Sequence, residues 1–467
     1  NLTITHNPLY HTPAWTFHEA DGDDYVSHEF HFDEGYGTLA LTCRQNDAMR
    51  PGVPFEIETW RFANRLRGPR PMLRGYQVRP VVQLFTEMAT VLANGGFTQY
   101  YDQIMPDGTL DEASLDVMKG AFDLLKEREP HLDLSLQRTD YAAIVWSAQN
   151  DGLNPPPWQD SHSHELEGVH LACCETHLPH RLVRDIDLSP ERLAGVKVLV
   201  LPNVMLLTSA MCDAIRAYVD AGGGLVATFR SSLCDGVGNS LDNFQLAAVF
   251  GCDYVEMFGY SSGFTKFTAD EPLSKDLRPD FPMTQYNKFM TKVRVRDGAT
   301  GVGRQVNPMR GMHMGNPPQE VTPYPAAVVN TFGKGRVVYL TAQVGDCYQD
   351  YGHPDYRTLL RNAILHAGGT PPVSLDAPAT VEMVPWGKPA GKRIIHLVNR
   401  TSAGPMRTKG SVITECIPVH GVKLTFADEV KSARLEPGGT ELEVKKIDAG
   451  WRVTVARLDV HGMVVVE

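Results

Sequence analysis

One apolar run constrains the fold of this 467-residue chain more than any other feature. Residues 196–202 read VKVLVLP, without polar alternation, which is typical of a strand buried on both faces of a parallel sheet. A helix is expected directly after it, from Thr208 as N-cap to Ala221, with Gly222 to Gly224 as the exit. Because such strands need helices on both faces of their sheet, this part of the chain is predicted to form a doubly wound α/β domain.

The predicted α/β domain covers 139–372 and has a flavodoxin- or amidotransferase-like character. Further strands are expected over 141–147, 225–229 and 335–341, and a further helix over 354–367. A nucleophilic cysteine in such a fold needs a tight strand-to-helix elbow flanked by glycines, and the sequence has no Gly-x-Cys-x-Gly. We therefore interpret this domain as structural, with assembly as its expected role.

The segments on either side have different patterns. In 1–138, strands are expected over 2–6, 25–31, 54–60 and 96–102, with helices over 79–94 and 110–127. Alternating strands and helices imply parallel pairing, and four such units are half of a (β/α)₈ barrel. The segment 373–467 has short alternating runs separated by turn residues, which predicts a small antiparallel β-sandwich.

The strand expected over 54–60 carries two carboxylates on one face. Because strand side chains alternate, Glu56, Glu58 and Trp60 point to the same side. Two acids and an indole are costly in an ordinary core, but they suit the polar mouth of a barrel where sugars react. Glu58 lies nearer the C-terminal end of the strand, where barrel active sites lie, and Glu56 lies one layer deeper. Either is a candidate nucleophile, and the alternative is a buried carboxylate paired with an arginine such as Arg61, Arg74 or Arg79.

Other polar groups are candidates for the same site. Glu29, in the run SHEFH, is a candidate sugar-hydroxyl acceptor or general acid, and the alternative is a solvated strand. For Trp60 the alternative is filling of the barrel centre, and for Asp102 and Gln103 it is capping of a helix. The candidate substrate-binding residues are Asn7, Trp60, Arg61, Tyr101, Asp102 and Gln103.

No cofactor and no metal site is expected. Asp160, His162, His164 and Glu165 follow a proline-rich loop in a polar run, and we expect a solvated loop there rather than a metal cluster. His396 lies in an alternating strand and is expected to be a satisfied core histidine. The eight cysteines include no CxxC pair, which favours reduced thiols and a cytoplasmic protein.

Charge and hydropathy exclude two classes of partner. The formal net charge of -11 argues against a nucleic-acid polyanion. No apolar run reaches the roughly 18 residues that a membrane span needs, so no membrane partner is expected.

Several short pieces together resemble a known family. They are PFE with Thr59 and Arg61, LANGG over 92–96, YDQ over 101–103, PDGTL over 106–110, KEREP over 126–130, YVDAGGG over 218–224 and IHLVN over 395–399. With the order of the three segments, they resemble glycoside hydrolases that carry a β-galactosidase trimerisation domain. The resemblance is to glycoside hydrolase family 42 and to the related fucosidase-like glycosidases.

The resemblance implies a retaining glycosidase that cleaves terminal galactosides or fucosides, and a carbohydrate-binding homo-oligomer, a trimer or a dimer. In the family, about four further barrel strands precede the point that matches residue 1, and the acid/base carboxylate lies on the fourth. The strand with Glu56 and Glu58 corresponds to strand seven, which carries the nucleophile. We therefore expect an N-terminal barrel half to be missing from this chain, which opens at Asn1 without a methionine. The alternative is a non-catalytic sugar-binding or assembly subunit with an incomplete barrel; a weaker one is an amidotransferase-like enzyme.

Overall fold

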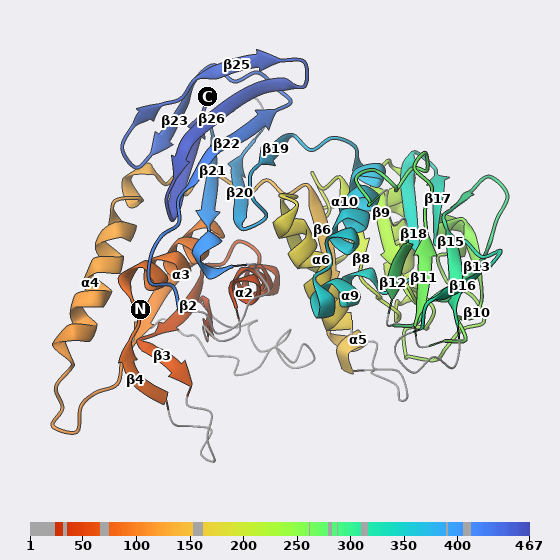
Figure 1. Cartoon of the computed structure of the whole chain (residues 1–467), viewed down its shortest axis with the longest axis horizontal. Helices are drawn as coiled ribbons and strands as arrows, with labels where there is room; N and C mark the ends of the chain where they lie inside the picture. The colour runs from red at the N-terminus through yellow and green to blue at the C-terminus, as the bar shows by residue number, and fades with distance from the viewer. Residues whose placement is uncertain are drawn as a thin grey trace.

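The computed structural model shows a mixed α/β protein, as predicted. It describes residues 24–30, 35–65, 74–152, 162–260, 262–278, 283–286, 288–309, 316–388, 391–404 and 412–467. Three parts follow one another along the chain in Figure 1: a red and orange part at lower left, a large yellow-to-cyan part on the right, and a blue part above the first. In the described residues, no helix is long and apolar enough to cross a membrane.

The first part is built on a three-stranded parallel sheet in the order β1-β2-β5. Its strands are β1 (Val26–Glu29), β2 (Phe55–Trp60) and β5 (Phe97–Tyr101), and a hairpin of β3 (Phe62–Arg65) and β4 (Arg74–Val78) follows β2. The helices are α2 (Tyr36–Met49), α3 (Val81–Ala93), α4 (Glu112–Lys126) and the short 3₁₀ turn η3 (Glu129–His131). The strands that the structure describes form an open sheet and no closed barrel, and the strand expected over 2–6 lies outside the described residues.

Packing of α3 explains how the first sheet is supported. The helix buries Leu84, Phe85 and Met88, which recur at helical spacing. The chain then turns through Gly95 and Gly96, and a Cβ at Gly96 would lie 2.3 Å from the ring of Phe55. Only glycine allows this close approach of the β5 entry to β2.

The second part is a seven-stranded sheet in the order β14-β17-β18-β9-β8-β6-β7. Its strands are β6 (Ala142–Trp146), β7 (His180–Arg184), β8 (Val198–Leu201), β9 (Gly224–Thr228), β14 (Thr300–Val302), β17 (Ala327–Phe332) and β18 (Gly335–Leu340). The helical elements are α5 (Ala148–Gly152), α6 (His162–Glu175), η4 (Asp185–Asp187), α7 (Ser209–Asp220), α8 (Ala247–Phe250), α9 (Val344–Tyr351) and α10 (Pro354–Gly368). The five parallel strands follow the order 2-1-3-4-5 of flavodoxin-like folds, and β14 and β17 extend the sheet antiparallel.

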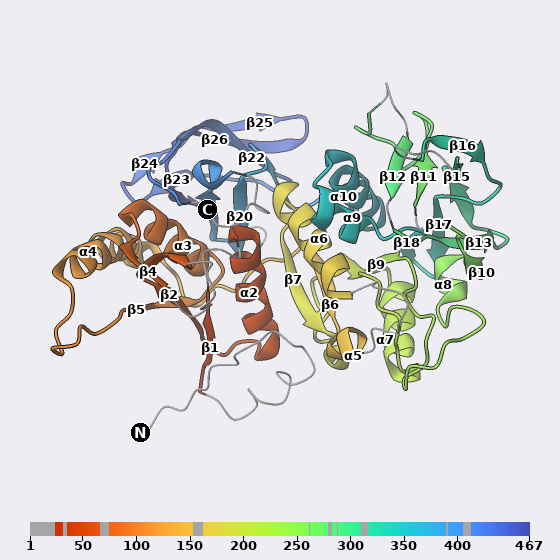
Figure 2. The ribbon, with the colours of Figure 1, turned by 60° about the horizontal axis from the view of Figure 1, so that its bottom comes forward.

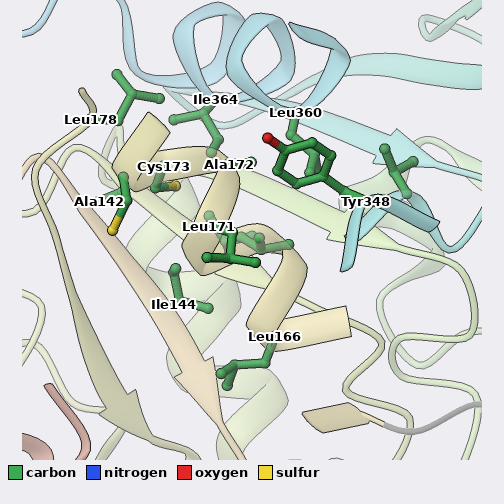
Figure 3. Packing of buried hydrophobic residues seen from close by; sticks show 14 of the residues in the cluster. Ala142, Ile144, Leu166, Leu171, Ala172, Cys173, Leu178, Tyr348, Leu360 and Ile364 are labelled. Atoms are coloured by element: carbon green, nitrogen blue, oxygen red, sulfur yellow. The ribbon is translucent and has the colours of Figure 1, made fainter. Parts of the chain in front are cut away.

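The apolar run over 196–202 contains β8, which lies in the middle of this sheet, and the four residues of β8 are fully buried. Side chains of α6, including Leu166, Leu171 and Cys173, pack between β6 and α10 (Figure 3). Helices α6 and α9 meet backbone to backbone at two glycines: a Cβ on Gly168 would lie 1.7 Å from the carbonyl oxygen of Gly345.

Two small antiparallel sheets are inserted between β9 and β18. They pair β10 (Cys252–Met257) with β13 (Thr291–Val295), and β11 (Gly263–Lys266) with β12 (Met283–Tyr286), β15 (Arg304–Pro308) and β16 (Pro318–Val321). They lie at the far right of the molecule in Figure 1, away from the first sheet.

The last part consists of two antiparallel sheets that share an apolar core. One has the order β19-β22-β26-β25, with β19 (Val373–Asp376), β22 (Val419–Phe426), β25 (Val444–Ile447) and β26 (Gly450–Leu458). The other has the order β20-β21-β27-β23-β24, with β20 (Val381–Gly387), β21 (Arg393–Asn399), β23 (Ala433–Glu436), β24 (Thr440–Glu441) and β27 (His461–Val466); η5 (Thr401–Ala403) follows β21.

A buried ion-pair network joins the three parts. Arg44 of α2 donates to Glu382 of β20 at 2.8 Å and to the carbonyl oxygen of His180 in β7 at 3.1 Å. Arg400, after β21, pairs with the other oxygen of Glu382 and donates to the carbonyl oxygen of Tyr36 at 3.4 Å. Figure 2 shows α2 between the first sheet and β7, which is the place where these groups meet.

Candidate active site

One face of the first sheet gathers the predicted carboxylates. In the parallel register, Ser27 lies opposite Glu56, and Glu29 lies opposite Glu58. On the other side of β2, Glu58 lies opposite Gln99. Registered partners in a parallel pair point to the same face, so side chains from all three strands converge around the two glutamates of β2.

Glu56 is held by donors from both neighbouring strands. The hydroxyl of Ser27 donates to its Oε1 at 2.7 Å. With its amide nitrogen turned toward β2, Gln99 donates to both carboxylate oxygens, at 3.1 and 3.2 Å. Burial raises the pKa of Glu56, and the hydrogen bond from Ser27 acts in the opposite direction. Donors on both sides orient this carboxylate and favour its charged form.

Glu58 is half-buried and has negative neighbours. Burial raises the pKa of Glu58, and the charges of Glu29 and Glu56 raise it further. A raised pKa is what a carboxyl group needs to hold a proton and release it in a reaction. The two glutamates of β2 therefore differ in electrostatic setting although they lie two residues apart.

Aromatic rings border the carboxylates. Trp60 and Tyr101 lie with ring centroids 4.6 Å apart, and Tyr25 and Phe97 with centroids 5.6 Å apart. Tyr101 and Phe97 are 41% and 47% exposed, whereas Trp60 is 8% exposed. Burial raises the pKa of Tyr25, and the charges of Glu56 and Glu58 add to the shift, so its hydroxyl shares their surroundings. Exposed aromatic faces beside carboxylates are suited to sugar rings, whose C–H faces stack on aromatics.

The arginines proposed as partners for the glutamates bind other acids. On the opposite face of the sheet, Arg79 pairs with Glu87 of α3 at 2.5 Å and donates to the hydroxyl of Thr59 at 2.6 Å. In the part of the chain that the structure describes, neither Glu56 nor Glu58 takes part in an ion pair. The side chain of Arg74 lies outside that part.

Arg61 and Asp102 form a buried pair at the C-terminal end of the sheet. Arg61 contacts Asp102 at 3.0 Å and Asp111 at 2.5 Å, and its side chain is buried. Asp111 also caps α4 by accepting from the backbone N–H of Ala113 at 3.1 Å, and Asp102 accepts from the backbone N–H of Gln103 at 2.7 Å. These contacts position the loop after β5, while a substrate-binding role for Arg61, Asp102 and Gln103 stays a prediction.

One predicted site residue lies outside the described part of the chain, and three residues of the site were not predicted from the sequence. Asn7 lies outside the described residues. Ser27, Gln99 and Tyr25 were not predicted as site residues, although Ser27 and Gln99 alternate in phase with Glu29 and Tyr101 on their strands. This alternation along the strand is the one feature of the sequence that points to Ser27 and Gln99. It places them in the site only when the pairing register of the strands is known.

The prediction of a solvated loop around His162 was wrong. His162 and Glu165 are buried in the first turn of α6, and Asp160 lies outside the described residues. His162 Nε2 accepts from the backbone N–H of Ser147 at 3.0 Å, and its Nδ1 lies 2.7 Å from the carbonyl oxygen of Pro202. The chain buries these polar groups because strand ends from other parts of the sheet satisfy them.

Two clusters within the described residues have metal-ligand chemistry. In the first, His164, Asp346 and Asp350 converge, but the ammonium of Lys288 lies 3.0 Å from each aspartate and supplies the positive charge. The second cluster is His170, Cys174 and His180, and it is fully buried.

His396 is a satisfied core histidine, as predicted. It is buried in β21, and its Nδ1 lies 3.1 Å from Nε2 of His461. Burial lowers the pKa of His396 to about 4, which keeps the ring neutral near neutral pH.

A protein-family model described as the β-galactosidase trimerisation domain matches residues 143–365. The predicted resemblance is confirmed for this segment. The match covers the flavodoxin-like sheet and its helices rather than the strands with the candidate carboxylates. No curated protein matches the sequence.

Solved structures share the fold over nearly the whole chain. The α-L-fucosidase isoenzyme 2 from Paenibacillus thiaminolyticus has a TM-score of 0.77 at 21% identity, and the match covers 95% of this chain and 65% of that one. The β-galactosidase from Bacillus circulans sp. alkalophilus has a TM-score of 0.72 at 15% identity, covering 100% of this chain and 64% of that one. The β-galactosidase from Rahnella sp. R3 has a TM-score of 0.67 at 14% identity, with coverage of 100% and 64%. This chain thus spans slightly less than two thirds of the length of these proteins.

Proposed function

We propose that the protein is a glycosidase that cleaves terminal galactosides or fucosides with retention of configuration. The observation that carries the proposal is the grouping of Glu29, Glu56 and Glu58 on one face, beside the aromatic rings of Trp60 and Tyr101. The family match and the shared fold with fucosidase and β-galactosidase structures support it.

The electrostatic settings assign different roles to the two glutamates of β2. A nucleophile must be ionised, and Glu56 receives donors from Ser27 and Gln99 that stabilise its charge. A general acid must hold a proton; burial raises the pKa of both glutamates, and the charges of Glu29 and Glu56 raise that of Glu58 further. Glu29, the direct neighbour of Glu58, is the second candidate for proton transfer.

Retention is proposed from the resemblance, because the backbone spacing along β2 does not by itself select a mechanism. Residues two apart on a strand are separated by roughly 6.6 Å along the chain. Retaining glycosidases keep their two carboxyl groups about 5–5.5 Å apart, so that one attacks the anomeric carbon while the other protonates the leaving oxygen. Inverting glycosidases keep theirs about 6.5–9.5 Å apart, so retention requires the side chains of Glu56 and Glu58 to lean toward one another.

Kinetics of carboxylate variants of the full-length protein test the proposal. We expect Glu56→Gln to lower hydrolysis of nitrophenyl galactosides or fucosides by about 10²-fold or more, and Glu58→Gln to lower hydrolysis of the corresponding alkyl glycosides by as much. Glu112→Gln, an exposed position at the start of α4, is the matched control and should retain activity. If both variants of β2 keep activity within about tenfold of the parent protein, the assignment of this strand is wrong.

Two further measurements separate the roles. Azide should restore turnover and yield a glycosyl azide of inverted configuration in Glu56→Ala, because a small anion fits the space that the removed carboxylate leaves. A variant that lacks the general acid should lose far more activity on substrates with poor leaving groups than on nitrophenyl glycosides, whose leaving groups need no proton. A pattern opposite to the expected one would exchange the roles of Glu56 and Glu58.

A second candidate function is a non-catalytic sugar-binding or assembly subunit. It is favoured by the position of the family match, which lies on the oligomerisation domain and not on the first sheet. Retained sugar binding without hydrolysis of any glycoside by the full-length protein would support it. Light scattering coupled to size exclusion would show whether the protein is a trimer in either case.

An amidotransferase-like reaction is not supported. Of the eight cysteines, seven are buried, and Cys416 is the one with partial exposure. A cysteine nucleophile must reach its substrate, and Cys234 is buried beside Met205 and Leu206 rather than placed on an exposed elbow.

A further inference from the structure

The strongest feature that the proposed function leaves unused is a buried cluster where the first part meets the α/β domain. His170 and Cys174 lie one turn apart on α6, and His180 begins β7. Their exposed fractions are 1%, 4% and 1%. The ligand atoms of all three residues lie within 4.8 Å of one another.

The outer nitrogen of each imidazole is fixed by a backbone carbonyl. His170 Nε2 lies 3.1 Å from the carbonyl oxygen of Gly37 in α2. His180 Nδ1 lies 2.9 Å from the carbonyl oxygen of Leu178. A carbonyl oxygen only accepts, so both outer nitrogens carry the hydrogen. Backbone carbonyls hold metal-binding histidines in the same way.

The inner nitrogens then face each other as two lone pairs. His170 Nδ1 and His180 Nε2 lie 2.9 Å apart. In two neutral rings whose hydrogens are on the outer side, both of these atoms are acceptors, and two acceptors at this distance repel each other. A positively charged species between them, either a shared proton or a metal ion, removes the repulsion.

The thiol of Cys174 favours a metal over a proton. Its Sγ lies 3.9 Å from His170 Nδ1. Zinc–nitrogen and zinc–sulfur bonds of about 2.0 and 2.3 Å in a tetrahedral arrangement place two nitrogens roughly 3.3 Å apart and a nitrogen and a sulfur roughly 3.6 Å apart. The nitrogen–nitrogen separation is about 0.4 Å shorter and the Sγ–Nδ1 separation about 0.3 Å longer than these values. Because Sγ also lies 3.7 Å from His170 Nε2, a rotation of the Cys174 side chain toward the inner nitrogens completes the site.

The charges around the cluster also favour a thiolate ligand. Arg44 and Arg400 share the carboxylate of Glu382, and the neighbouring Arg138 pairs with both Asp47 and Asp140, so three guanidinium groups face three carboxylates. A shared proton with a neutral thiol would add one uncompensated positive charge. A thiolate offsets one positive charge of a bound metal ion, so zinc adds one charge and copper(I) adds none.

We propose that His170, Cys174 and His180 bind a thiophilic closed-shell metal ion, zinc or copper(I), as a structural site. Thiolate and imidazole ligands suit both ions. The ion would tie α6 and β7 together directly beneath α2, which contributes the carbonyl of Gly37 and the guanidinium of Arg44 to the surroundings of the site. It would thereby stabilise the contact between the first part and the α/β domain.

Metal analysis of the full-length protein tests the site. Protein produced with added zinc, or with added copper under reducing conditions, should carry about one bound ion per chain after extensive dialysis. The preparation that retains a bound ion, with zinc or with copper, identifies the metal. Cobalt(II), used as a zinc probe, should give a thiolate-to-cobalt absorption band, which a site of nitrogen and oxygen ligands does not give.

Two neighbouring cysteines provide matched variants. Cys174→Ser and His180→Gln should lose the ion and the cobalt band, whereas Cys173→Ser should keep both, because Cys173 packs on the sheet side of α6 (Figure 3). Both serine variants bury one hydroxyl in the same helix, so their effects on folding are comparable. A strong chelator should lower the melting temperature of the parent protein and not that of folded Cys174→Ser.

Three results would overturn the proposal. One is parent protein that stays free of metal in every medium and shows no cobalt band. Another is a cobalt band that survives in Cys174→Ser. The third is a shared N–H proton between the two rings, seen by nitrogen-15 NMR in protein that was offered both metals. Measurements on the parent protein alone decide the question if the variants do not fold.

Discussion

Glu29 of β1 lies directly opposite Glu58 of β2 in the parallel register; burial raises the pKa of Glu58, and the negative charge of Glu29 raises it further. Two like charges on neighbouring strands are unfavourable in an ordinary sheet. The two carboxyl groups lie beside exposed aromatic rings, and this arrangement is consistent with a site that uses a carboxyl group as a proton donor.

Glu29→Gln should lower the pKa of Glu58. Removing a neighbouring negative charge makes ionisation of Glu58 easier, so its pKa moves down toward the ordinary value. A general acid works only while it is protonated, so the alkaline limb of the pH profile of kcat/KM should shift to lower pH. Carbon-13 NMR titration of the Glu58 carboxyl group checks the shift independently of activity. An unchanged titration in a folded variant would show that the two carboxylates do not interact.

Glu382→Gln should strongly destabilise the protein. Glu382 is the one carboxylate shared by Arg44 and Arg400, and all three side chains are buried. Breaking a buried ion pair by removing one partner costs about 3–5 kcal/mol, since it leaves an uncompensated charge. Denaturant unfolding measures the loss. Asp376→Asn is the matched control: it breaks an exposed pair with Lys423 and should cost no more than about 1 kcal/mol.

The raised pKa of Glu165 predicts that the free energy of unfolding declines as the pH rises. Burial raises the pKa of Glu165 to about 7, above the ordinary value of 4.5. The folded state therefore binds the proton more tightly than the unfolded state, and this contribution to stability is present below about pH 4.5 and is lost as the pH rises through about 7. Each pKa unit corresponds to about 1.4 kcal/mol.

Replacing Glu165 tests that decline. Glu165→Gln removes the titration but keeps an oxygen to accept from the backbone N–H of Asp346, a bond of 2.7 Å. The free energy of unfolding of this variant should fall less between pH 4.5 and 7 than that of the parent protein. Glu415→Gln, at an exposed position, should leave the parent pH dependence intact. Parallel pH curves for Glu165→Gln and the parent would contradict the raised pKa.

The sequence predicted the elements whose patterns are local. The strand predicted over 225–229 differs from β9 by one residue at each end, and the helix over 79–94 differs from α3 by one or two residues at each end. Alternating and continuous apolar runs report whether one or both faces of a strand are buried, and that information lies within a few residues.

Contacts between distant segments could not be predicted in this way. His162 and Glu165 looked like solvated residues because their partners, Ser147, Pro202 and Asp346, come from separate strand ends and a helix start. The cluster of His170, Cys174 and His180 shows the same limitation. A helical spacing of four places the first two on one face, but only the pairing of β7 with β6 brings the third to them.

Ser27→Ala should shift the pKa of Glu56 in the direction opposite to the effect of Glu29→Gln on Glu58. The hydroxyl of Ser27 donates to Glu56 at 2.7 Å and stabilises the charged form, so its loss should raise the pKa of Glu56 further. A nucleophile works only when it is ionised, so the acidic limb of kcat/KM should move to higher pH while the alkaline limb stays in place.

Ser27→Thr is the control for this last substitution. It keeps a hydroxyl group in reach of Glu56, so it should preserve the acidic limb if the added methyl group is accommodated. A shift of both limbs in Ser27→Ala would point to a general loss of site geometry. A shift of the alkaline limb alone would place the proton donor, rather than the nucleophile, on Glu56.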